Sequence, residues 1–411
     1  MRIQIISILI VSLLGVKAKT QHLVQSSDFF QRTIADSRAL QHQYDQQNIV
    51  LPWVDTYEFR TESDELALNG QKYVFRLTPT SPAVRKAHAA LFRHYRKKLS
   101  LVEDFYLDSR IEEAYEQWVQ LYICQRELAL YTQLQSVYRD KCTVYRKQLQ
   151  QEDFNFTQLI EAQRKSTDIK VKIEKLNVAL QVLESQNDLS RKQLSFDDII
   201  DVNEIKEVLS SESEYQLADV EYLYQQEQLD KEITLEKAEK RKILDFAQVE
   251  YGNRRSSEKP INERISVGLA LKLPTYGKRN LKIEEMKIKQ QELYLEHQIH
   301  HQRVDDKIEN LLLQTHSEIE IYQTLERAQI EEDQAYRELK QFILREKEGD
   351  LLLLLDIIQN QTKTELDKIK RLNDVYEKYL AFLATSGKMF AKPFKNYLVS
   401  PAQKAIADTE R

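Results

Sequence analysis

Proline and glycine are scarce in this chain, with only 7 of each among 411 residues. No proline lies between Ala83 and Lys259, or between Thr275 and Lys392. Because a proline inside a helix costs about 3 kcal/mol, these two proline-free stretches predict long uninterrupted helices. The prolines gather instead around residues 51–82 and 245–274 and in a polar C-terminal tail, 388–411.

Cysteine is nearly absent, since the chain has only Cys124 and Cys142. If both lie on one helix, their separation in sequence places them about 27 Å apart. A disulfide needs Cα atoms within about 7 Å of each other. The two thiols are therefore predicted to be buried or idle, and neither a disulfide framework nor a metal site is expected from them.

Long apolar runs are also missing, except at the N-terminus. Residues 1–18 combine a positive Arg2, an apolar stretch from Ile3 to Val16 and a small-residue site that ends at Ala18. This pattern predicts a cleaved secretory signal peptide, because the apolar stretch is shorter than the roughly 20 residues of a membrane-spanning helix.

No strong charge of one sign is present. The net charge is −5, with 30% of the residues charged and 42% hydrophobic. This balance argues against a nucleic-acid partner and against disorder. The sequence also lacks a nucleophile elbow, a phosphate-binding loop and a cysteine cluster. Neither an enzyme nor a cofactor is therefore predicted.

What the chain does contain is a β-hairpin signal in residues 245–274. The stretch Arg264–Pro274 alternates with a period of two, which is typical of a strand. A barrel strand in a membrane separates lipid-facing from water-facing side chains in this way over about 9–11 residues. The side chains predicted to face lipid are Ile265, Val267, Leu269 and Leu271, because the opposite face is polar or small.

A second hairpin is predicted in residues 51–82, with Asn69-Gly70 at its turn. Trp53 and Tyr57 share one face of its first strand, and Tyr73 lies in its second strand. Together with Tyr251 of the other hairpin, these side chains predict an aromatic girdle at the membrane interface. Ordinary packing within a sandwich is the alternative.

Each hairpin is followed by a long helical pattern. After a helical lead-in at 19–50 and the first hairpin, apolar residues recur in steps of three and four through 83–244. A turn near 151–155 and a broken equatorial segment at 186–215 interrupt this pattern. The same order of elements returns in 275–387, with a turn near 348–351. The two halves therefore form an internal structural repeat.

Four amphipathic strands cannot close a barrel. Single-chain outer-membrane barrels begin at about eight strands, and an open sheet edge is not tolerated in lipid. The long helical seams likewise need other helices to cover them. The predicted fold is therefore mainly α with short transmembrane β-strands, in which several chains together build a short barrel on a long coiled-coil helical tunnel.

Two stretches, Val267–Pro274 with the following Tyr276-Gly277, and Gly349–Gln361, resemble motifs of the TolC-like outer-membrane efflux family. The order of elements over nearly the whole mature chain is similar to that family. Asp153 departs from the pattern, because the family usually has glycine there. The resemblance implies a homotrimer in the outer membrane of a Gram-negative bacterium, with a twelve-stranded barrel in lipid and a tunnel across the periplasm.

The resemblance also implies partners and a gate. The partners would be a periplasmic adaptor and an inner-membrane pump of a tripartite efflux or type I secretion system. Asp356 sits best at the acidic constriction and Asp350 is the second candidate, although Asp350 could equally be a helix N-cap. The predicted docking tip comprises Asp153, Phe154, Gly349, Leu351 and Leu352. The apolar run 351–355 fits adaptor docking and an internal core equally well.

His297 and His301 lie four residues apart, a spacing that can hold a metal. No third ligand at a supporting spacing is evident, and the surrounding helix is highly polar. A solvated helix face without a metal is therefore predicted.

A soluble periplasmic coiled-coil scaffold, or an adaptor-like protein, is the competing hypothesis for the whole chain. Adaptors share the long helical hairpin, but they also carry Gly- and Val-rich β domains, which are missing here. The faces of the strands separate the two hypotheses, because a lysine at Leu269 should abolish membrane assembly of a barrel and harm a soluble scaffold only mildly.

Overall fold

The computed structural model describes residues 26–39, 52–63, 71–150, 156–187, 194–211, 219–252, 264–272, 277–345 and 351–399. The predicted signal peptide lies outside the described residues, as do Asp153, Phe154, Gly349 and Asp350. The chain divides into two compact units. The sheet unit comprises residues 38–107 and 217–306, and the helical unit comprises residues 1–37, 108–216 and 307–411.

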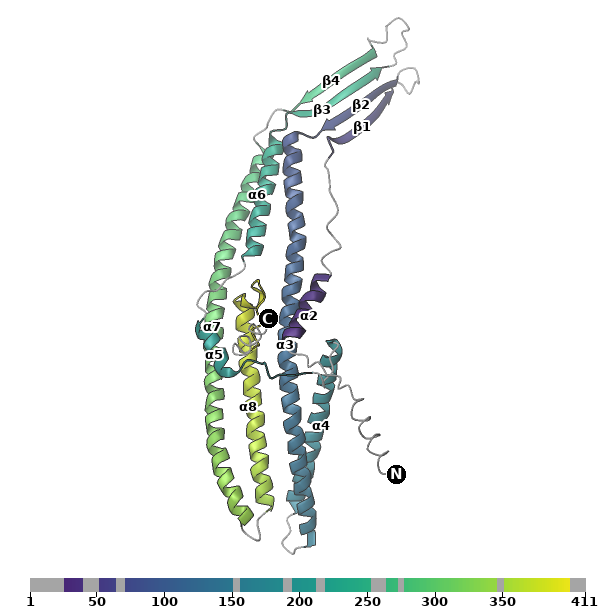
Figure 1. Cartoon of the computed structure of the whole chain (residues 1–411). Helices are drawn as coiled ribbons and strands as arrows, with labels where there is room; N and C mark the ends of the chain where they lie inside the picture. Colours follow the sequence, from purple (N-terminus) through teal and green to yellow (C-terminus); the bar gives the residue numbers. More distant parts are fainter. Residues whose placement is uncertain are drawn as a thin grey trace, which may run out of the picture. The chain divides into compact units, whose positions relative to one another are not determined.

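Four antiparallel strands form the sheet, in the order β1-β2-β3-β4. Their bounds are Val54–Ser63 for β1, Gln71–Pro79 for β2, Leu244–Gly252 for β3 and Ile265–Leu271 for β4. Both predicted hairpins are present. The second strand of the first hairpin pairs with the first strand of the second, so that segments far apart in the sequence lie side by side (Figure 1).

Each hairpin leads into a long helix and a return helix, which agrees with the predicted internal repeat (Figure 1). In the first half these helices are α3, Pro82–Lys147, and α4, Phe156–Gln186. In the second half they are α7, Lys278–Arg345, and α8, Leu351–Thr385. None of the described helices is both long and apolar enough to cross a membrane. Cys124 and Cys142 both lie on α3 and are free thiols.

The described chain also contains three shorter α-helices, α2, Ser26–Ala39, α5, Val202–Ser211, and α6, Val220–Lys240, and two 3-10 helices, Gln148–Gln150 and Lys388–Phe390. The helical pattern of residues 205–244 covers most of α5 and all of α6, and residues 212–218 lie outside the described residues. Helix α6 ends at Lys240 because Leu244 already pairs with Leu271 in the sheet. Gly387 follows α8 with a φ of 72°, the left-handed conformation expected of a glycine that ends a helix.

The core of the helical unit draws its largest side chains from α3 and α8. Trp118 on α3 and Tyr376 and Tyr379 on α8 are fully buried. The Tyr376 hydroxyl donates to the carbonyl oxygen of Ile200 at 2.6 Å. Burial raises the pKa of Tyr376 well above its ordinary value, so this hydroxyl stays a hydrogen-bond donor.

Two segments that the sequence marks as polar are packed into this core. Ile199 and Val399 form an antiparallel bridge, and the Ile200 N–H donates to the Leu398 carbonyl at 2.8 Å. Met389 and Leu398 are buried, although they belong to the stretch expected to be a polar tail. The described part of that stretch, 388–399, is packed because a few apolar side chains anchor an otherwise polar sequence.

Helix α2 is hydrogen-bonded to the same part of the helical unit. The Ser26 hydroxyl donates to Asp198 at 2.6 Å, and the Asn396 side-chain amide donates to the Ser26 hydroxyl at 3.1 Å. Residues from the beginning, the middle and the end of the chain therefore share one hydrogen-bonded cluster.

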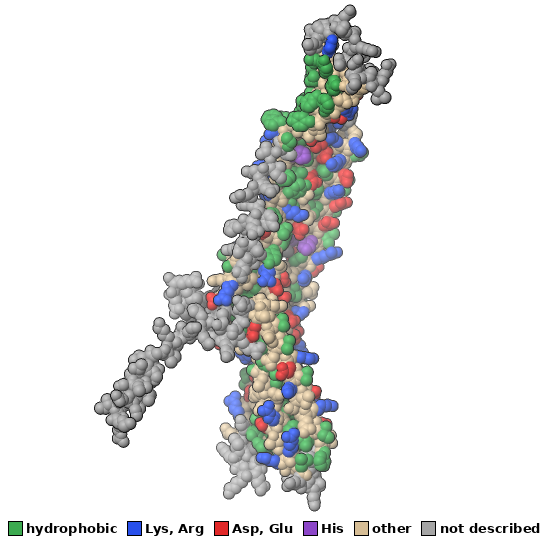
Figure 2. Space-filling model, turned by 90° about the vertical axis from the view of Figure 1, so that its right-hand side faces the viewer, with side chains coloured by type: hydrophobic (Ala, Val, Ile, Leu, Met, Phe, Trp, Pro, Cys, Tyr) green, Lys and Arg blue, Asp and Glu red, His purple; other side chains and the backbone are tan. Residues whose placement is uncertain are grey.

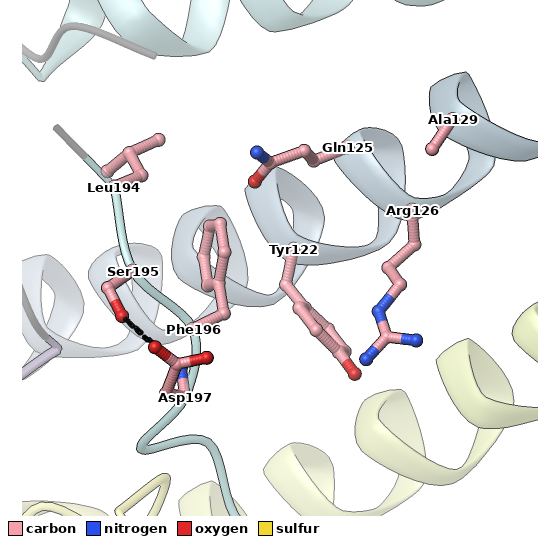
Figure 3. Close-up of a pocket in the computed structure, with 8 residues that line it drawn as sticks. All are labelled: Tyr122, Gln125, Arg126, Ala129, Leu194, Ser195, Phe196 and Asp197. Carbon is pink, nitrogen blue, oxygen red and sulfur yellow. Dashed lines mark hydrogen bonds between the residues drawn. The ribbon is translucent and has the colours of Figure 1, made fainter. Parts of the chain in front are cut away.

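A pocket of about 410 Å³ lies where residues 194–197 pass α3 (Figure 3). The rings of Phe196 and Tyr122 face each other with centroids 5.4 Å apart. The Ser195 hydroxyl donates to Asp197 at 2.9 Å. That serine therefore hydrogen-bonds an acceptor two residues away on its own loop, which is the arrangement of a loop brace and not of a nucleophile with its general base.

In the sheet unit, α6 is held to its neighbours by charged and polar side chains. Glu227 accepts hydrogen bonds from Lys231 at 2.5 Å and from Lys97 of α3 at 3.2 Å. These two lysines lower the pKa of Glu227 to about 2. On the α7 side, Glu236 pairs with Lys282, and Asp230 accepts from Gln290 at 2.7 Å.

Candidate functional site

One face of the sheet is apolar across all four strands. The register places Phe59, Phe75, Val249 and Val267 in one row, each directly opposite the next. The neighbouring rows are Tyr57, Leu77, Ala247 and Leu269, and Thr61, Tyr73, Tyr251 and Ile265. Most of these large side chains are exposed, Val267 by 72% and Leu269 by 67%. Figure 2 shows hydrophobic side chains gathered along the strands.

The opposite face of the sheet is polar and internally bonded. Arg76 lies at its centre, where it donates to Gln248 at 3.2 Å and to Glu58 at 3.3 Å. Lys72 pairs with Glu250 at 3.0 Å. Charged side chains on this face therefore satisfy one another across three strands, while the apolar face leaves its side chains uncovered.

Gly268 completes this polar face. Its position lies opposite Gln248 in the register. A Cβ atom added there would come within 3.0 Å of the Gln248 side chain, closer than carbon atoms normally approach. The glycine therefore leaves room for Gln248 to lie flat across the strand and accept from Arg76.

The predicted aromatic girdle residues do not lie in one row. Tyr73 and Tyr251 are direct cross-strand partners, stacked with centroids 6.4 Å apart. Trp53 lies beyond the other end of the sheet, where its carbonyl accepts from the Thr80 N–H at 2.8 Å. The seven steps from Tyr73 to Thr80 span about 23 Å along the strand. The aromatic side chains thus lie at two levels, with Tyr57 between them.

Both edges of the sheet are open in the single chain. The strand order leaves β1 and β4 with one neighbour each. An edge strand offers a row of unpaired N–H and C=O groups to any other strand that reaches it. An amphipathic sheet with two open edges can therefore extend by pairing β4 of one copy with β1 of another.

The predicted constriction residue Asp356 lies near the start of α8 and is half exposed, with its partner on α3. It forms an ion pair with Lys141, whose side chain is only 6% exposed. The same ammonium donates to Gln359 at 2.7 Å. Lys141 could not be predicted from the sequence, because the periodicity of neither helix indicates which residues of α3 and α8 face each other.

The apolar run at the start of α8 changes from exposed to buried along its length. Leu351 and Leu353 are exposed and Leu352 is half buried, whereas Leu355 and Ile357 are buried in the core. The alternative of an internal core therefore holds for Leu355 and Ile357, whereas adaptor docking at the first turn stays a prediction. The other residues of the predicted docking tip lie outside the described part of the chain.

Helix α4 carries a second exposed apolar surface, which we call the α4 stripe. It consists of Phe156, Ile160, Val171, Val178 and Val182, all exposed. At about 100° per residue these positions fall within roughly 80° of arc, on one side of the helix. The buried residues Ala162, Ile169 and Leu180 lie on the opposite side and pack inward. The helix is thus apolar on two sides, and only one side is covered within the chain.

No protein-family model and no curated protein sequence matches this chain. Solved structures do match its fold. The CmeC outer membrane channel of Campylobacter jejuni superposes with a TM-score of 0.54 at 10% identity, covering 94% of this chain and 85% of that one. The MtrE outer membrane channel of Neisseria gonorrhoeae gives 0.52 at 14% identity, covering 87% and 85%.

The chain has the fold of these outer membrane channels. CusC, described for its transmembrane channel formation, is similar to the same extent, with a TM-score of 0.54 over 88% of this chain and 87% of that one. The resemblance to the TolC-like family seen in the sequence is therefore confirmed for the fold, with its long helices, its four-strand sheet and its repeat. At 10% identity between this chain and CusC, the likeness concerns the fold alone.

Proposed function

We propose that this protein is a subunit of a trimeric outer-membrane channel, a passive conduit for substrates that leave a Gram-negative cell. The carrying observation is the sheet, apolar on one face, polar and ion-paired on the other, and open at both edges. Three copies would join β4 to β1 at each boundary and close a barrel of twelve strands. Closure would satisfy both edges, as spanning a bilayer requires.

In such a barrel, the two faces of the sheet would be in contact with different solvents. The uncovered row from Phe59 to Val267 would face lipid, where exposed apolar side chains cost nothing. The network around Arg76 would face the water-filled interior. Aromatic side chains at two levels would anchor the barrel at both interfaces of the outer membrane.

The helices support the same assembly. The α4 stripe repeats in steps of four, eleven, seven and four residues, a spacing that packs against another helix. In a trimer, a neighbouring subunit would cover it and so complete a helical tunnel below the barrel. The energy for export would come from an inner-membrane pump, reached through an adaptor that docks near the exposed Leu351.

The gate proposal rests on Asp356. If the pair with Lys141 opened, its carboxylate could turn to the tunnel axis near the helix tips, where three unpaired copies would attract cations and repel anions. Its pairing with Lys141 ties the start of α8 to α3. Opening the tips would then require this pair to break or to move with both helices.

The test of the function is a pair of lysine substitutions on β4. Leu269→Lys places a charge on the apolar face, and Ser266→Lys places the same charge on the polar face of the same strand, beside Glu250. Both positions are exposed in the single chain, so a soluble scaffold would tolerate both changes. A barrel would tolerate only Ser266→Lys, because lysine at the lipid midplane costs about 2–4 kcal/mol per subunit.

The measurement is the native mass of the protein extracted from isolated outer membranes in mild detergent. We expect a trimer for the wild type and for Ser266→Lys, and loss of the trimer from the membrane fraction for Leu269→Lys. A monomer or dimer in the soluble periplasmic fraction, or normal membrane recovery of Leu269→Lys, would contradict the proposal.

A further inference from the structure

Two histidines and an aspartate of the sheet unit converge at the beginning of α6. Asp219 immediately precedes that helix, and His297 and His301 lie one turn apart on α7. One carboxylate oxygen of Asp219, Oδ1, lies 2.9 Å from Nε2 of His297 and 2.7 Å from Nε2 of His301. The third partner that the spacing of the histidines lacks in the sequence is thus supplied from 78 residues earlier.

From this geometry we propose that Asp219, His297 and His301 form a binding site for a divalent transition-metal ion, with Zn²⁺ as the ion it fits best. The three ligand atoms lie within 4.8 Å of one another. Two ligand atoms on one tetrahedral zinc ion are about 3.3 Å apart, since each bond is about 2.0–2.1 Å long. Small shifts of the side chains would therefore admit the ion.

The donor set decides the class of ion. Two imidazole nitrogens and one carboxylate oxygen suit Zn²⁺ and similar borderline ions, whereas Ca²⁺ and Mg²⁺ require mostly oxygen ligands. Three protein ligands leave a fourth position for water. All three side chains are partly buried, so they are shielded from bulk water without being closed to an entering ion.

A neighbouring ring holds the site in place. Tyr222, in the first turn of α6, stacks on His297 with centroids 3.8 Å apart and the planes inclined by 22°. The two imidazoles meet edge to face, with centroids 4.4 Å apart. His297 is therefore held between the Tyr222 ring and the His301 ring. Less side-chain conformational entropy is then lost when a metal binds.

A bound ion would fasten the start of α6 to the middle of α7. Further along, those two helices also meet through polar contacts, among them those of Glu236, Asp230 and Glu239. The site would make the stability of the sheet unit depend on metal concentration, because an ion that binds only the folded state stabilises it by mass action.

The experiment uses the full-length protein purified in mild detergent and treated with a chelator. Zn²⁺ is added in an isothermal titration, and Co²⁺ is added separately to record its visible absorption, which reports nitrogen and oxygen ligands directly. The variants are His297→Gln, His301→Gln and Asp219→Asn. The matched control is His300→Gln, an exposed histidine on the same turn of α7 that lies outside the cluster.

We expect one Zn²⁺ per chain, a rise in melting temperature with Zn²⁺, and at least a tenfold loss of affinity in each of the three variants but not in His300→Gln. Wild-type protein without saturable Zn²⁺ binding, or equal losses in His300→Gln, would overturn the site. The Co²⁺ spectrum of the wild type decides the matter even if a variant fails to fold. A chain that is trimeric yet binds no metal refutes this inference alone, and a chain that binds metal without forming trimers refutes only the channel.

Discussion

The return helices of the two halves, α4 and α8, occupy matching places in the repeat but differ in how much of their apolar surface the chain itself covers. Helix α8 buries apolar side chains along almost its whole length, from Leu355 to Leu383. Helix α4 buries Ala162, Ile169 and Leu180 and leaves its stripe exposed. The second return helix thus contributes more to the core than the first, which leaves one of its two apolar sides exposed.

The two halves of the repeat therefore use their return helices differently. Both helices are similarly long, 31 and 35 residues, so length does not separate them. What separates them is the distribution of apolar residues, which forms one continuous face on α8 and two opposed faces on α4. An exposed apolar surface of this kind marks an interaction site, and in the proposed trimer a neighbouring subunit would cover it.

Removing a core side chain from α8 tests whether this helix forms the core of the helical unit. Phe382 is 1% exposed. We expect Phe382→Ala to lower the free energy of unfolding by about 3–5 kcal/mol, because it removes a buried ring and leaves a cavity. Urea unfolding in one detergent, followed by far-UV circular dichroism, measures the change. A loss below about 1 kcal/mol would show that α8 is not the core of the unit.

A charge on the α4 stripe should act on assembly and not on the subunit. We expect Val178→Lys to leave the secondary structure intact and to shift the monomer–trimer equilibrium toward monomer by at least about tenfold, because the lysine would be buried without a partner. Sedimentation in mild detergent measures it. The control is Gln158→Lys, which lies on another side of the helix and is exposed. Equal dissociation in both variants would remove the stripe from the interface.

A weaker effect is expected in α6, which carries ion pairs beside its few buried side chains. The pKa of Glu227 is lowered to about 2 by Lys231 and Lys97. Because its folded pKa lies below the ordinary value, its contribution to stability is present above about pH 4.5 and disappears as the pH falls toward 2. Wild-type protein should therefore lose slightly more stability than Glu227→Gln between pH 5 and pH 3.

That difference should stay below about 1 kcal/mol, because the Glu227 side chain is 39% exposed and water screens its ion pairs. Urea midpoints at the two pH values measure it. A larger acid sensitivity in Glu227→Gln than in the wild type would reverse the sign and contradict the assignment.

Most of the fold could be predicted from the sequence, because the patterns that indicate its strands and helices are local. The period of two in 264–274 and the absence of proline from two long stretches define strands and helices without reference to partners. The end of α6 at Lys240 was missed, since the helical pattern runs on to Leu244, which the structure places in β3. The burial of Leu398 was missed because it depends on a bridge formed with residues 199–200.

The candidate sites were predictable from the sequence only where their residues belong to one element. Exposure of Leu269 and its row follows from alternation along one strand. The pairing of Asp356 with Lys141, and of Asp219 with two histidines, joins residues far apart in sequence. The register between packed helices decides such contacts, and periodicity within one helix does not contain that register.

The hydrogen-bonded cluster of Ser26, Asp198 and Asn396 bears on when the subunit can finish folding. The contact between Ser26 and Asn396 closes a loop of 370 residues. Contacts of such high sequence separation form late, since the chain must first lose the entropy of the enclosed loop. Because α2 and residues 388–399 meet through this junction with residues 198–200, we expect it to be among the last parts of the helical unit to become ordered during folding.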